Sequence, residues 1–328
     1  MTPDPRRRSI LRNVMLAVVV VVLLAAVATF FALRDTRTVD GEAHPGTLAS
    51  TTAPPSTTAP LPRQLRPGAT YVNMGDSYAA GTGGRDLAPD APVRCQRTAS
   101  NPGAQVAKRM KWKLTDVSCT SATTENLTVA QNDEVEPQVD ALSEKTDVVS
   151  VILGANDEAF FGLLVSKCAD LGGVHPTGSP CKDQYGDELK AILTDETGPN
   201  LTAAFEQIAA AAPNAQIYAV GYPWLVPKSG DCRPALAFAD GDIPFARSMQ
   251  ALLNEKLEAA VASVDGTFVD MSGLSDGHDA CAGADARWVE PAFDPDTGRR
   301  TGVPGNHPNE RGQAAMATAL EAAIRAQR

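Results

Sequence analysis

Short apolar runs alternate with longer amphipathic stretches from residue 69 to the end of the chain. Five of the short runs hold six or seven residues rich in valine, isoleucine and tyrosine, which is typical of buried strands. They are ATYVNM (69–74), LTDVSC (114–119), DVVSVIL (147–153), QIYAVGY (216–222) and GTFVDM (266–271). The pattern therefore predicts five strands.

Helical patterns occupy most of the gaps between these runs. The stretch at 101–112 begins with a Ser-Asn-Pro start signal, and residues 242–264 form the longest amphipathic stretch. Two alanine-rich stretches, 198–212 and 309–327, complete the set. Since strands and helices alternate, we expect a three-layer α/β/α sandwich. Its mainly parallel five-stranded sheet is expected to have the flavodoxin-like strand order.

The N-terminus carries a hydrophobic segment long enough to cross a membrane. Four arginines precede Val14–Leu33, twenty residues in which Thr29 is the only polar one. At about 1.5 Å per residue, such a helix spans a hydrocarbon layer of about 30 Å. We expect a signal anchor at 14–33, with a basic cytoplasmic tail at 1–13 and the rest of the chain outside. The alternative is a signal peptide that is cleaved near Ala28, where the sequence AVA offers a site.

Residues 34–66 are rich in proline, threonine, serine and alanine and show no periodicity. This composition predicts an extended linker between the anchor and the folded part. The remaining residues, 67–328, are expected to form one catalytic domain. At 43% hydrophobic residues, the chain can bury a sizeable core.

The charge balance excludes one broad class of function. The formal net charge is −10, whereas nucleic-acid binders present clustered lysine and arginine. We therefore expect no nucleic-acid partner, and we expect a monomer.

Six cysteines follow the hydrophobic segment, and none forms a CxxC pair with metal-binding spacing. An even number in an oxidising compartment predicts three disulfides. Many pairings are possible, and joining neighbours in the sequence closes loops of moderate length. These pairs are Cys95–Cys119, Cys168–Cys181 and Cys232–Cys281.

Polar sequences stand where three of the predicted strands end. GDS (75–77) follows the first strand, SCTSATT (118–124) belongs to the end of the second, and GANDE (154–158) follows the third. In parallel sheets of this kind, the ligand crevice lies beyond the carboxyl ends of the strands. Ser77 has only small residues at 79–81 after it, so an acyl group can approach its hydroxyl. The alternative for Ser77 is a helix N-cap with an exposed hydroxyl.

A serine nucleophile needs a positioned base, and the sequence holds four histidines. His44 lies in the predicted linker, and His175 lies in a Gly/Pro loop. His278, in SDGHDAC, has carboxylates and a cysteine nearby, which favours a structural or pocket-lining role. His307 stands in HPNERG, where the next two residues start a helix and fix the ring at the edge of the sheet. We predict that His307 is the base.

The motifs GDSYAAG, GAND and HPN occur in this order and at the predicted strand ends. Together they resemble the SGNH branch of the GDSL esterases and lipases, over about residues 69–327. Two further loops, GYPWLVP (221–227) and DGHDAC (276–281), resemble a secreted subgroup of that family with three disulfides.

The resemblance implies a serine hydrolase that forms an acyl-enzyme and needs no metal or other cofactor. It assigns the nucleophile to Ser77 and the base to His307. The oxyanion hole would consist of the backbone N–H groups of Ser77 and Ser121 and the side-chain amide of Asn156. The family usually has glycine where Ser121 stands, so this N–H is available only if the backbone angles suit a residue with a Cβ atom. The alternative for Asn156 is a turn residue that caps the next helix.

One position departs from the usual family pattern. Many members carry an aspartate three residues before the histidine, where it orients the imidazole, but this chain has Pro304 there. The subgroup uses a backbone carbonyl at that place, which implies a Ser-His dyad. We therefore expect the Pro304 carbonyl to orient His307, with Asp276 and Asp279 as alternative acids.

These features predict a lipase or esterase that cleaves carboxylic esters at the outer face of the cell membrane. The enzymatic alternatives are a phospholipase or a carbohydrate O-acyl esterase. The non-enzymatic alternative is an envelope-tethered binding module with a degraded site.

The segment Asp294–Gly298 lacks the ligand pattern of a calcium loop and is expected to be a turn. The substrate would be selected by three expected loops, 82–98, 158–185 and 222–245.

Overall fold

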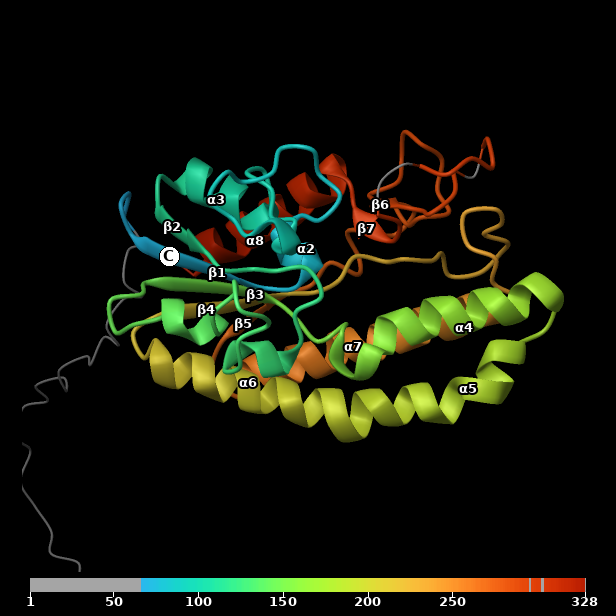
Figure 1. Cartoon of the computed structure of the whole chain (residues 1–328), viewed down its shortest axis with the longest axis horizontal. Helices are drawn as coiled ribbons and strands as arrows, with labels where there is room; N and C mark the ends of the chain where they lie inside the picture. The colour runs from blue at the N-terminus through green and yellow to red at the C-terminus, as the bar shows by residue number, and fades with distance from the viewer. Residues whose placement is uncertain (1–65, 295, 302–303, 328) are drawn as a thin grey trace, which may run out of the picture. The chain divides into compact units, whose positions relative to one another are not determined.

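The computed structural model describes residues 66–294, 296–301 and 304–327. Its centre is a five-stranded sheet with a layer of helices on each face (Figure 1). The strands are β1 (Thr70–Gly75), β2 (Lys113–Asp116), β3 (Val148–Ile152), β4 (Gln216–Val220) and β5 (Thr267–Val269). All neighbours are parallel, in the order β2-β1-β3-β4-β5. The predicted three-layer fold and strand order are confirmed.

The middle of the sheet is the core of the domain. All five residues of β3 are buried, whereas β2, at the edge, has alternately exposed and half-buried residues. Burying one valine or isoleucine side chain contributes roughly 1.5 to 3 kcal/mol. The apolar run at 147–153 was therefore correctly interpreted as a strand covered on both faces.

One face of the sheet carries three helices, α2 (Ser77–Ala80), α3 (Pro102–Met110) and α8 (Glu310–Ala326). The α3 helix starts where the sequence predicts, because the Asn101 side chain accepts a hydrogen bond from the N–H of Ala104 at 2.9 Å. The α8 helix starts in the same way at Asn309, which caps the N–H groups of Arg311 and Gly312. Asn101 also donates to the carboxylate of Asp116, the last residue of β2, at 2.8 Å.

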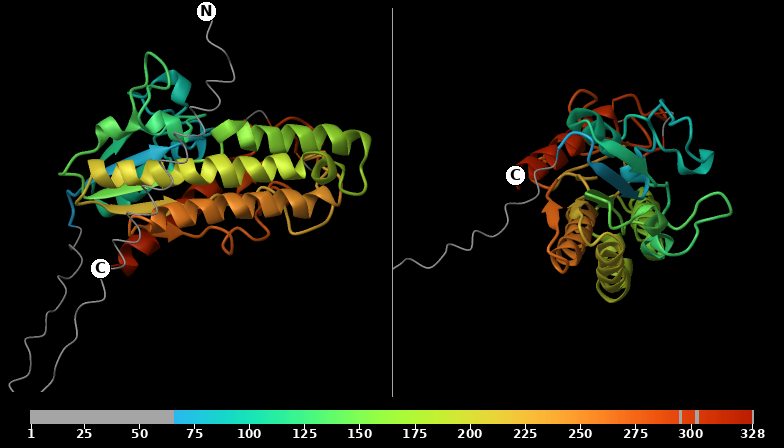
Figure 2. Two further views of the ribbon diagram at one scale, coloured as in Figure 1. Left: turned by 90° about the horizontal axis from the view of Figure 1, so that it is seen from below. Right: turned by 90° about the vertical axis from the view of Figure 1, so that its left-hand side faces the viewer.

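The opposite face carries four longer helices, α4 (Phe160–Val174), α5 (Pro180–Ala191), α6 (Gly198–Ala211) and α7 (Asp242–Ala262). A π-helical turn, Ile192–Thr197, joins α5 to α6. Figure 2 shows α4, the α5–α6 rod and α7 lying side by side. Short 3₁₀ turns lie at Val93–Cys95, Thr124–Leu127, Gln138–Ala141 and Asp157–Ala159.

The prediction that residues 158–185 form a loop is wrong, because α4 and the start of α5 occupy them. The buried positions on α4 are four residues apart, at Phe160, Leu164, Cys168 and Gly172. Such a stripe on a helix that is apolar on several sides produces little periodic contrast in the sequence. At Gly172 an added Cβ would lie 2.2 Å from the carbonyl oxygen of Ala237, so only glycine fits this contact.

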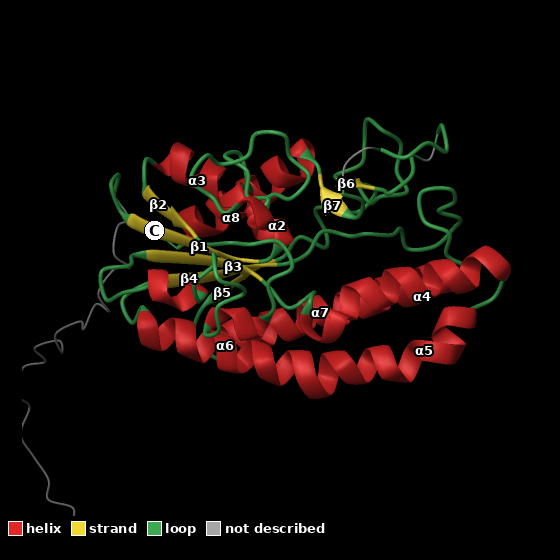
Figure 3. Ribbon diagram, in the orientation of Figure 1, coloured by secondary structure: helices red, strands yellow, loops and turns green. Residues whose placement is uncertain are grey.

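The structure pairs the cysteines as neighbours in the sequence: Cys95–Cys119, Cys168–Cys181 and Cys232–Cys281. The first joins the 82–98 loop to the chain after β2, and the second joins α4 to α5. In the chain-entropy description, loops of this size each contribute roughly 3 to 4 kcal/mol. Figure 3 shows that loops gather at one end of the sheet, near the short antiparallel pair β6 (Val289–Glu290) and β7 (His307–Pro308).

The predicted basic tail, signal anchor and most of the linker lie outside the described residues. In the part of the chain that the structure describes, no helix combines the length and the apolar character that a membrane span requires.

Candidate active site

Ser77 is the first residue of α2, directly beyond the end of β1. Asp76 caps this helix, since its carboxylate accepts the N–H of Tyr78 at 2.9 Å. Gly75 has a φ of +123°, and an added Cβ would lie 2.0 Å from the carbonyl oxygen of Ile152. A side chain at position 75 would therefore prevent the sharp turn that aims Ser77 out of the sheet.

His307, on β7, faces this serine. Its Nε2 lies 2.9 Å from Ser77 Oγ, and its Nδ1 lies 2.9 Å from the carbonyl oxygen of Gly305. A carbonyl only accepts hydrogen bonds, so Nδ1 carries the proton and the lone pair of Nε2 faces the serine hydroxyl. Burial lowers the pKa of His307, although the carbonyls of Gly305 and Pro304 partly oppose this. The imidazole is therefore neutral at pH 7 and able to accept a proton.

Two adjacent backbone carbonyls act on the His307 ring, that of Gly305 and that of Pro304, the predicted acceptor. The Gly305 carbonyl lies 2.9 Å from Nδ1 and has the larger effect on the pKa of His307. Asn306 adopts the left-handed conformation, with φ +66°, which turns the chain so that the Gly305 carbonyl points back at the ring. Gly305 itself packs against Ala292, where an added Cβ would lie 2.7 Å from the Ala292 Cα. The sequence contains no signal that distinguishes the two adjacent carbonyls.

Tyr78, the residue after Ser77, also stabilises the turn at residues 305–307. Its hydroxyl donates to the Asn306 carbonyl at 2.7 Å, and its ring lies 5.6 Å from the His307 ring. Thus the residue after the predicted nucleophile binds the residue before the predicted base. We did not predict this role, because the only sequence signal is the position of Tyr78 beside Ser77.

Asp76 and Tyr222 form a buried pair behind the nucleophile. The Tyr222 hydroxyl donates to Asp76 Oδ2 at 2.5 Å and accepts the N–H of Ala155 at 3.2 Å. Burial raises the pKa of Asp76 to about 7, against hydrogen bonds that lower it. The pair therefore connects the chain segments that follow β1, β3 and β4.

The predicted oxyanion donors lie on turns that follow the first three strands. The backbone N–H groups of Ser77 and Ser121 have no acceptor among the described residues. Ser121 adopts a φ of +64°, the conformation that glycine usually supplies. The Asn156 side-chain amide donates to the Ala122 carbonyl at 3.1 Å, which joins the second and third turns. A further link is the N–H of Cys119, which donates to the carbonyl of Gly75 at 3.0 Å.

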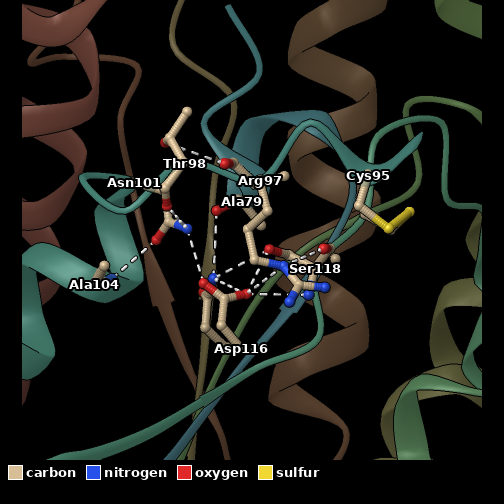
Figure 4. A network of polar contacts seen from close by, with 12 residues as sticks. Ala79, Cys95, Arg97, Thr98, Asn101, Ala104, Asp116 and Ser118 are labelled. Atoms are coloured by element: carbon tan, nitrogen blue, oxygen red, sulfur yellow. Dashed lines mark hydrogen bonds and ion pairs between the residues drawn. A yellow bond between two sulfur atoms is a disulfide. The ribbon is translucent and has the colours of Figure 1, made fainter. Parts of the chain in front are cut away.

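A buried polar network beneath α2 positions these turns (Figure 4). Asn73 on β1 donates to the Ala79 carbonyl at 3.3 Å and to Asp116 Oδ1 at 3.1 Å. Asn101 donates to the other oxygen of Asp116 at 2.8 Å, and Arg97 Nε lies 3.5 Å from Asp116 Oδ1. Burial raises the pKa of Asp116, while Arg97 lowers it. The network ties α2 to the end of β2 without using the serine hydroxyl.

The alternative acids do not contact His307. Asp276 forms ion pairs with Lys228, at 2.8 Å, and with Arg247. Asp279 is buried and accepts the N–H of Cys281 at 3.0 Å. Both carboxylates therefore stabilise the 276–281 loop.

His278 has the structural surroundings that its sequence context favours. Its ring stacks on Trp288, with 4.3 Å between centroids and 5° between planes. Its Nδ1 lies 2.5 Å from the Ala286 carbonyl. Farther along the chain, Asp294 accepts the N–H of Thr297 at 2.9 Å, as in a turn.

Comparison with known proteins gives one family and several relatives. The model of the GDSL-like lipase/acylhydrolase family matches residues 74–315. Lipase 2 of Streptomyces coelicolor is 40% identical over 233 residues, which cover 70% of this chain and 79% of that protein. A lipase of Streptomyces rimosus is 24% identical over 214 residues, which cover 65% of this chain and 74% of the relative.

Two crystal structures have a similar fold. Phospholipase A1 from Streptomyces albidoflavus gives a TM-score of 0.64 at 22% identity, and the match covers 78% of this chain and 99% of that one. The extracellular lipase from Streptomyces rimosus gives a TM-score of 0.64 at 21% identity, with 78% and 100% covered.

Proposed function

The chain belongs to the GDSL-like lipase and acylhydrolase family and is a carboxylic ester hydrolase, and we propose that it acts through an acyl-enzyme on Ser77. The observation that carries this proposal is the 2.9 Å contact between His307 Nε2 and Ser77 Oγ. This contact supports the proposal, because a neutral imidazole within hydrogen-bond distance of a hydroxyl can act as its base.

In the first half of the reaction, Ser77 Oγ attacks the ester carbonyl carbon while His307 Nε2 takes its proton. The imidazolium that forms is stabilised by the Gly305 carbonyl, which accepts from Nδ1. The tetrahedral oxyanion accepts hydrogen bonds from the N–H groups of Ser77 and Ser121 and from Asn156. Each such donor contributes about 3 to 4 kcal/mol to transition-state stabilisation.

Collapse of this intermediate breaks the bond to the leaving alcohol, and His307 passes its proton to the alcohol oxygen. In the second half, His307 deprotonates a water molecule that attacks the acyl-enzyme. The carboxylic acid then leaves, and the proton returns to Ser77 Oγ. Nucleophile, base and acid are thus supplied by two side chains.

Active-site labelling tests the assignment directly. A fluorophosphonate should modify Ser77 alone, as identified by peptide mass spectrometry, and should abolish hydrolysis of a short-chain p-nitrophenyl ester. Ser77→Ala should be inert to the probe and to the ester. Ser166→Ala, at an exposed position on α4, is the matched control and should behave like the wild type. Normal turnover by Ser77→Ala overturns the proposal.

We further propose that the enzyme acts outside the cytoplasm. Its catalytic domain, residues 67–328, is held at the membrane by a signal anchor at 14–33 and a linker at 34–66. Three disulfides support this location, because such bonds persist in oxidising compartments. Cleavage of a signal peptide near Ala28 is the alternative. Membrane fractionation followed by N-terminal sequencing distinguishes the two, since an anchored chain stays with the membrane and keeps residues 1–28.

A further inference from the structure

A cavity of about 600 Å³ lies beside His307. Its walls come from the chain after α2, from residues 287–301 and from the start of α8. His307 lines this cavity, but Ser77 and the other proposed oxyanion donors, Ser121 and Asn156, do not. The cavity therefore extends from the histidine side of the dyad.

The histidine side is where the alcohol part of an ester must lie. His307 passes its proton to the alcohol oxygen when the acyl-enzyme forms, so this oxygen has to be next to the imidazole. The rest of the alcohol then extends into the cavity. A volume of about 600 Å³ lies within the usual range for small-molecule sites.

Basic residues outnumber acidic ones around the cavity, although the whole chain has a formal net charge of −10. The basic lining residues are Arg85, Arg287, Arg299, Arg300 and Arg311, and the acidic ones are Glu290, Asp294 and Glu310. His307 adds no charge at neutral pH, because burial lowers its pKa. The cavity is thus a locally cationic region of an acidic protein.

Two of the three carboxylates are already engaged, since both oxygens of each accept hydrogen bonds from neighbouring residues. Glu290 accepts Arg287 Nε at 3.0 Å on one oxygen and Asn309 Nδ2 at 3.0 Å on the other. Asp294 accepts Arg287 Nη2 at 3.1 Å, and its second oxygen accepts the N–H and hydroxyl of Thr297. These acids hold the cavity wall together and have no free oxygen for a cationic ligand.

Arg287 is left with one unused donor. The residue is 6% exposed, and its Nη1 has no hydrogen-bond partner among the described residues. A buried donor without an acceptor is unfavourable by about 1 to 3 kcal/mol. This nitrogen is itself enclosed by protein atoms, so Arg287 contributes positive charge to the cavity wall but no free hydrogen bond from Nη1.

At the edge of the cavity, Arg85 and Arg299 are exposed, and neither side chain forms an ion pair with another described residue. The Arg300 guanidinium lies over the Phe293 ring, 5.2 Å from its centroid. Glu310 lacks a donor among the described residues and offsets one of these charges. The charges that remain free at the cavity edge are therefore mainly cationic.

We propose that this cavity binds a phosphate group on the alcohol part of the ester, so that the preferred substrates are acyl esters of phosphorylated alcohols. This inference rests on the proposed function and names its substrate class. A phosphate presents several oxygens and can accept forked hydrogen bonds from more than one guanidinium, whereas a carboxylate has only two oxygens.

The test compares two soluble esters with the same acyl chain, monobutyrylglycerol and monobutyrylglycerol phosphate, on the full chain. The wild type should have a kcat/KM about tenfold or more higher for the phosphate ester, since hydrogen bonds to charged groups are strong. Arg85→Gln/Arg299→Gln should lose this preference mainly through KM and keep its kcat/KM for the neutral ester. Arg94→Gln, at an exposed position on the same loop as Arg85 but outside the cavity, should retain the preference.

Equal kcat/KM values for the two esters in the wild type overturn the anion site but leave the proposed function intact. Failure to cleave either ester overturns the proposed function instead. Binding of glycerol phosphate to the Ser77→Ala variant, measured by calorimetry, is independent of turnover. Binding of glycerol phosphate should be detectable, and it should weaken when Arg85 and Arg299 are both changed to Gln in the Ser77→Ala variant. Absence of binding would refute the site.

A second substrate pair identifies the source of the phosphate. Vesicles of phosphatidylglycerol present it on a lipid surface, whereas monobutyrylglycerol phosphate presents it in solution. If Arg85→Gln/Arg299→Gln slows hydrolysis of the vesicles but not of the soluble ester, the phosphate belongs to a membrane lipid. If it slows hydrolysis of the soluble ester but not of the vesicles, the substrate is a free phosphorylated ester. If it slows neither reaction, the proposal is wrong.

Discussion

His307 Nε2 lies 2.9 Å from Ser77 Oγ, although 230 positions separate the two residues in the chain. Neighbouring residues stabilise the position of both side chains. Asp76 caps the helix that starts at Ser77, and Tyr78 binds the carbonyl that precedes His307. The three consecutive residues 76–78 therefore provide the helix cap, the proposed nucleophile and a hydrogen bond that supports the proposed base.

The first prediction is that Ser77→Ala and His307→Ala each remove nearly all esterase activity. Nucleophile and base act as one unit, so losing either leaves only the contribution of the oxyanion hole and substrate binding. We would measure kcat on a short-chain ester and check the fold of each variant by circular dichroism. An inactive His278→Ala together with an active His307→Ala would contradict the assignment of the base.

The second prediction concerns the missing carboxylate of the triad. Asp276→Asn and Asp279→Asn should keep kcat within about threefold of the wild type, because neither residue contacts His307. In a true triad, changing the carboxylate to an amide lowers turnover by about 10⁴. If one folded variant shows such a loss, orientation of His307 by the Gly305 carbonyl is wrong.

The sequence was sufficient to predict the sheet because its three central strands, β1, β3 and β4, are mainly apolar runs that parallel packing buries on both faces. It was not sufficient for α4, where Phe160–Val174 is apolar on several sides and has no clear polar face. Its buried stripe is defined by its neighbours, including α5, to which Cys168 is bonded. Tertiary contacts, rather than local periodicity, decide this segment.

The motifs were sufficient to place Ser77 and His307 at one edge of the sheet. They were not sufficient to identify the carbonyl that binds Nδ1, because this depends on the positive φ of Asn306. The support by Tyr78 was also missed, since it depends on a contact over 228 positions. Such details depend on how two distant turns meet.

The third prediction tests Tyr78 as a positioning residue. Tyr78→Phe keeps the ring but removes the hydrogen bond to the Asn306 carbonyl, so the Gly305–His307 turn is less firmly held. We expect kcat to fall by about tenfold with little change in KM, because catalysis requires accurate orientation. Tyr185→Phe, on α5 and remote from the dyad, should have no effect. A KM change alone would argue for substrate contact instead.

The fourth prediction follows from the lowered pKa of His307. The base must be neutral, so kcat/KM should be constant at neutral pH and fall only as pH drops through a value below 6.5. The pH–rate profile of a short-chain ester tests this. An acid limb centred above 6.5 would contradict burial as the dominant influence on this imidazole.

The last prediction concerns stability and the buried pair of Asp76 and Tyr222. Burial raises the pKa of Asp76 from 3.8 to about 7, so the folded protein holds a proton that the unfolded chain releases near pH 4. The contribution of this group is fully present below pH 3.8 and is lost as pH rises through about 7. His307, with its lowered pKa, has the opposite effect, since it destabilises the fold as pH falls.

A comparison of variants isolates the effect of Asp76. Asp76→Asn mimics the neutral carboxyl, so the urea midpoint of the wild type should decrease relative to that of this variant as pH rises from 3.8 to about 7, and the difference should stay constant above that. Asp270→Asn, at an exposed position, controls for the loss of a negative charge and should follow the wild type. If the wild type and Asp76→Asn respond to pH in parallel, Asp76 is already ionised throughout this range, and its contact with Tyr222 outweighs the effect of burial.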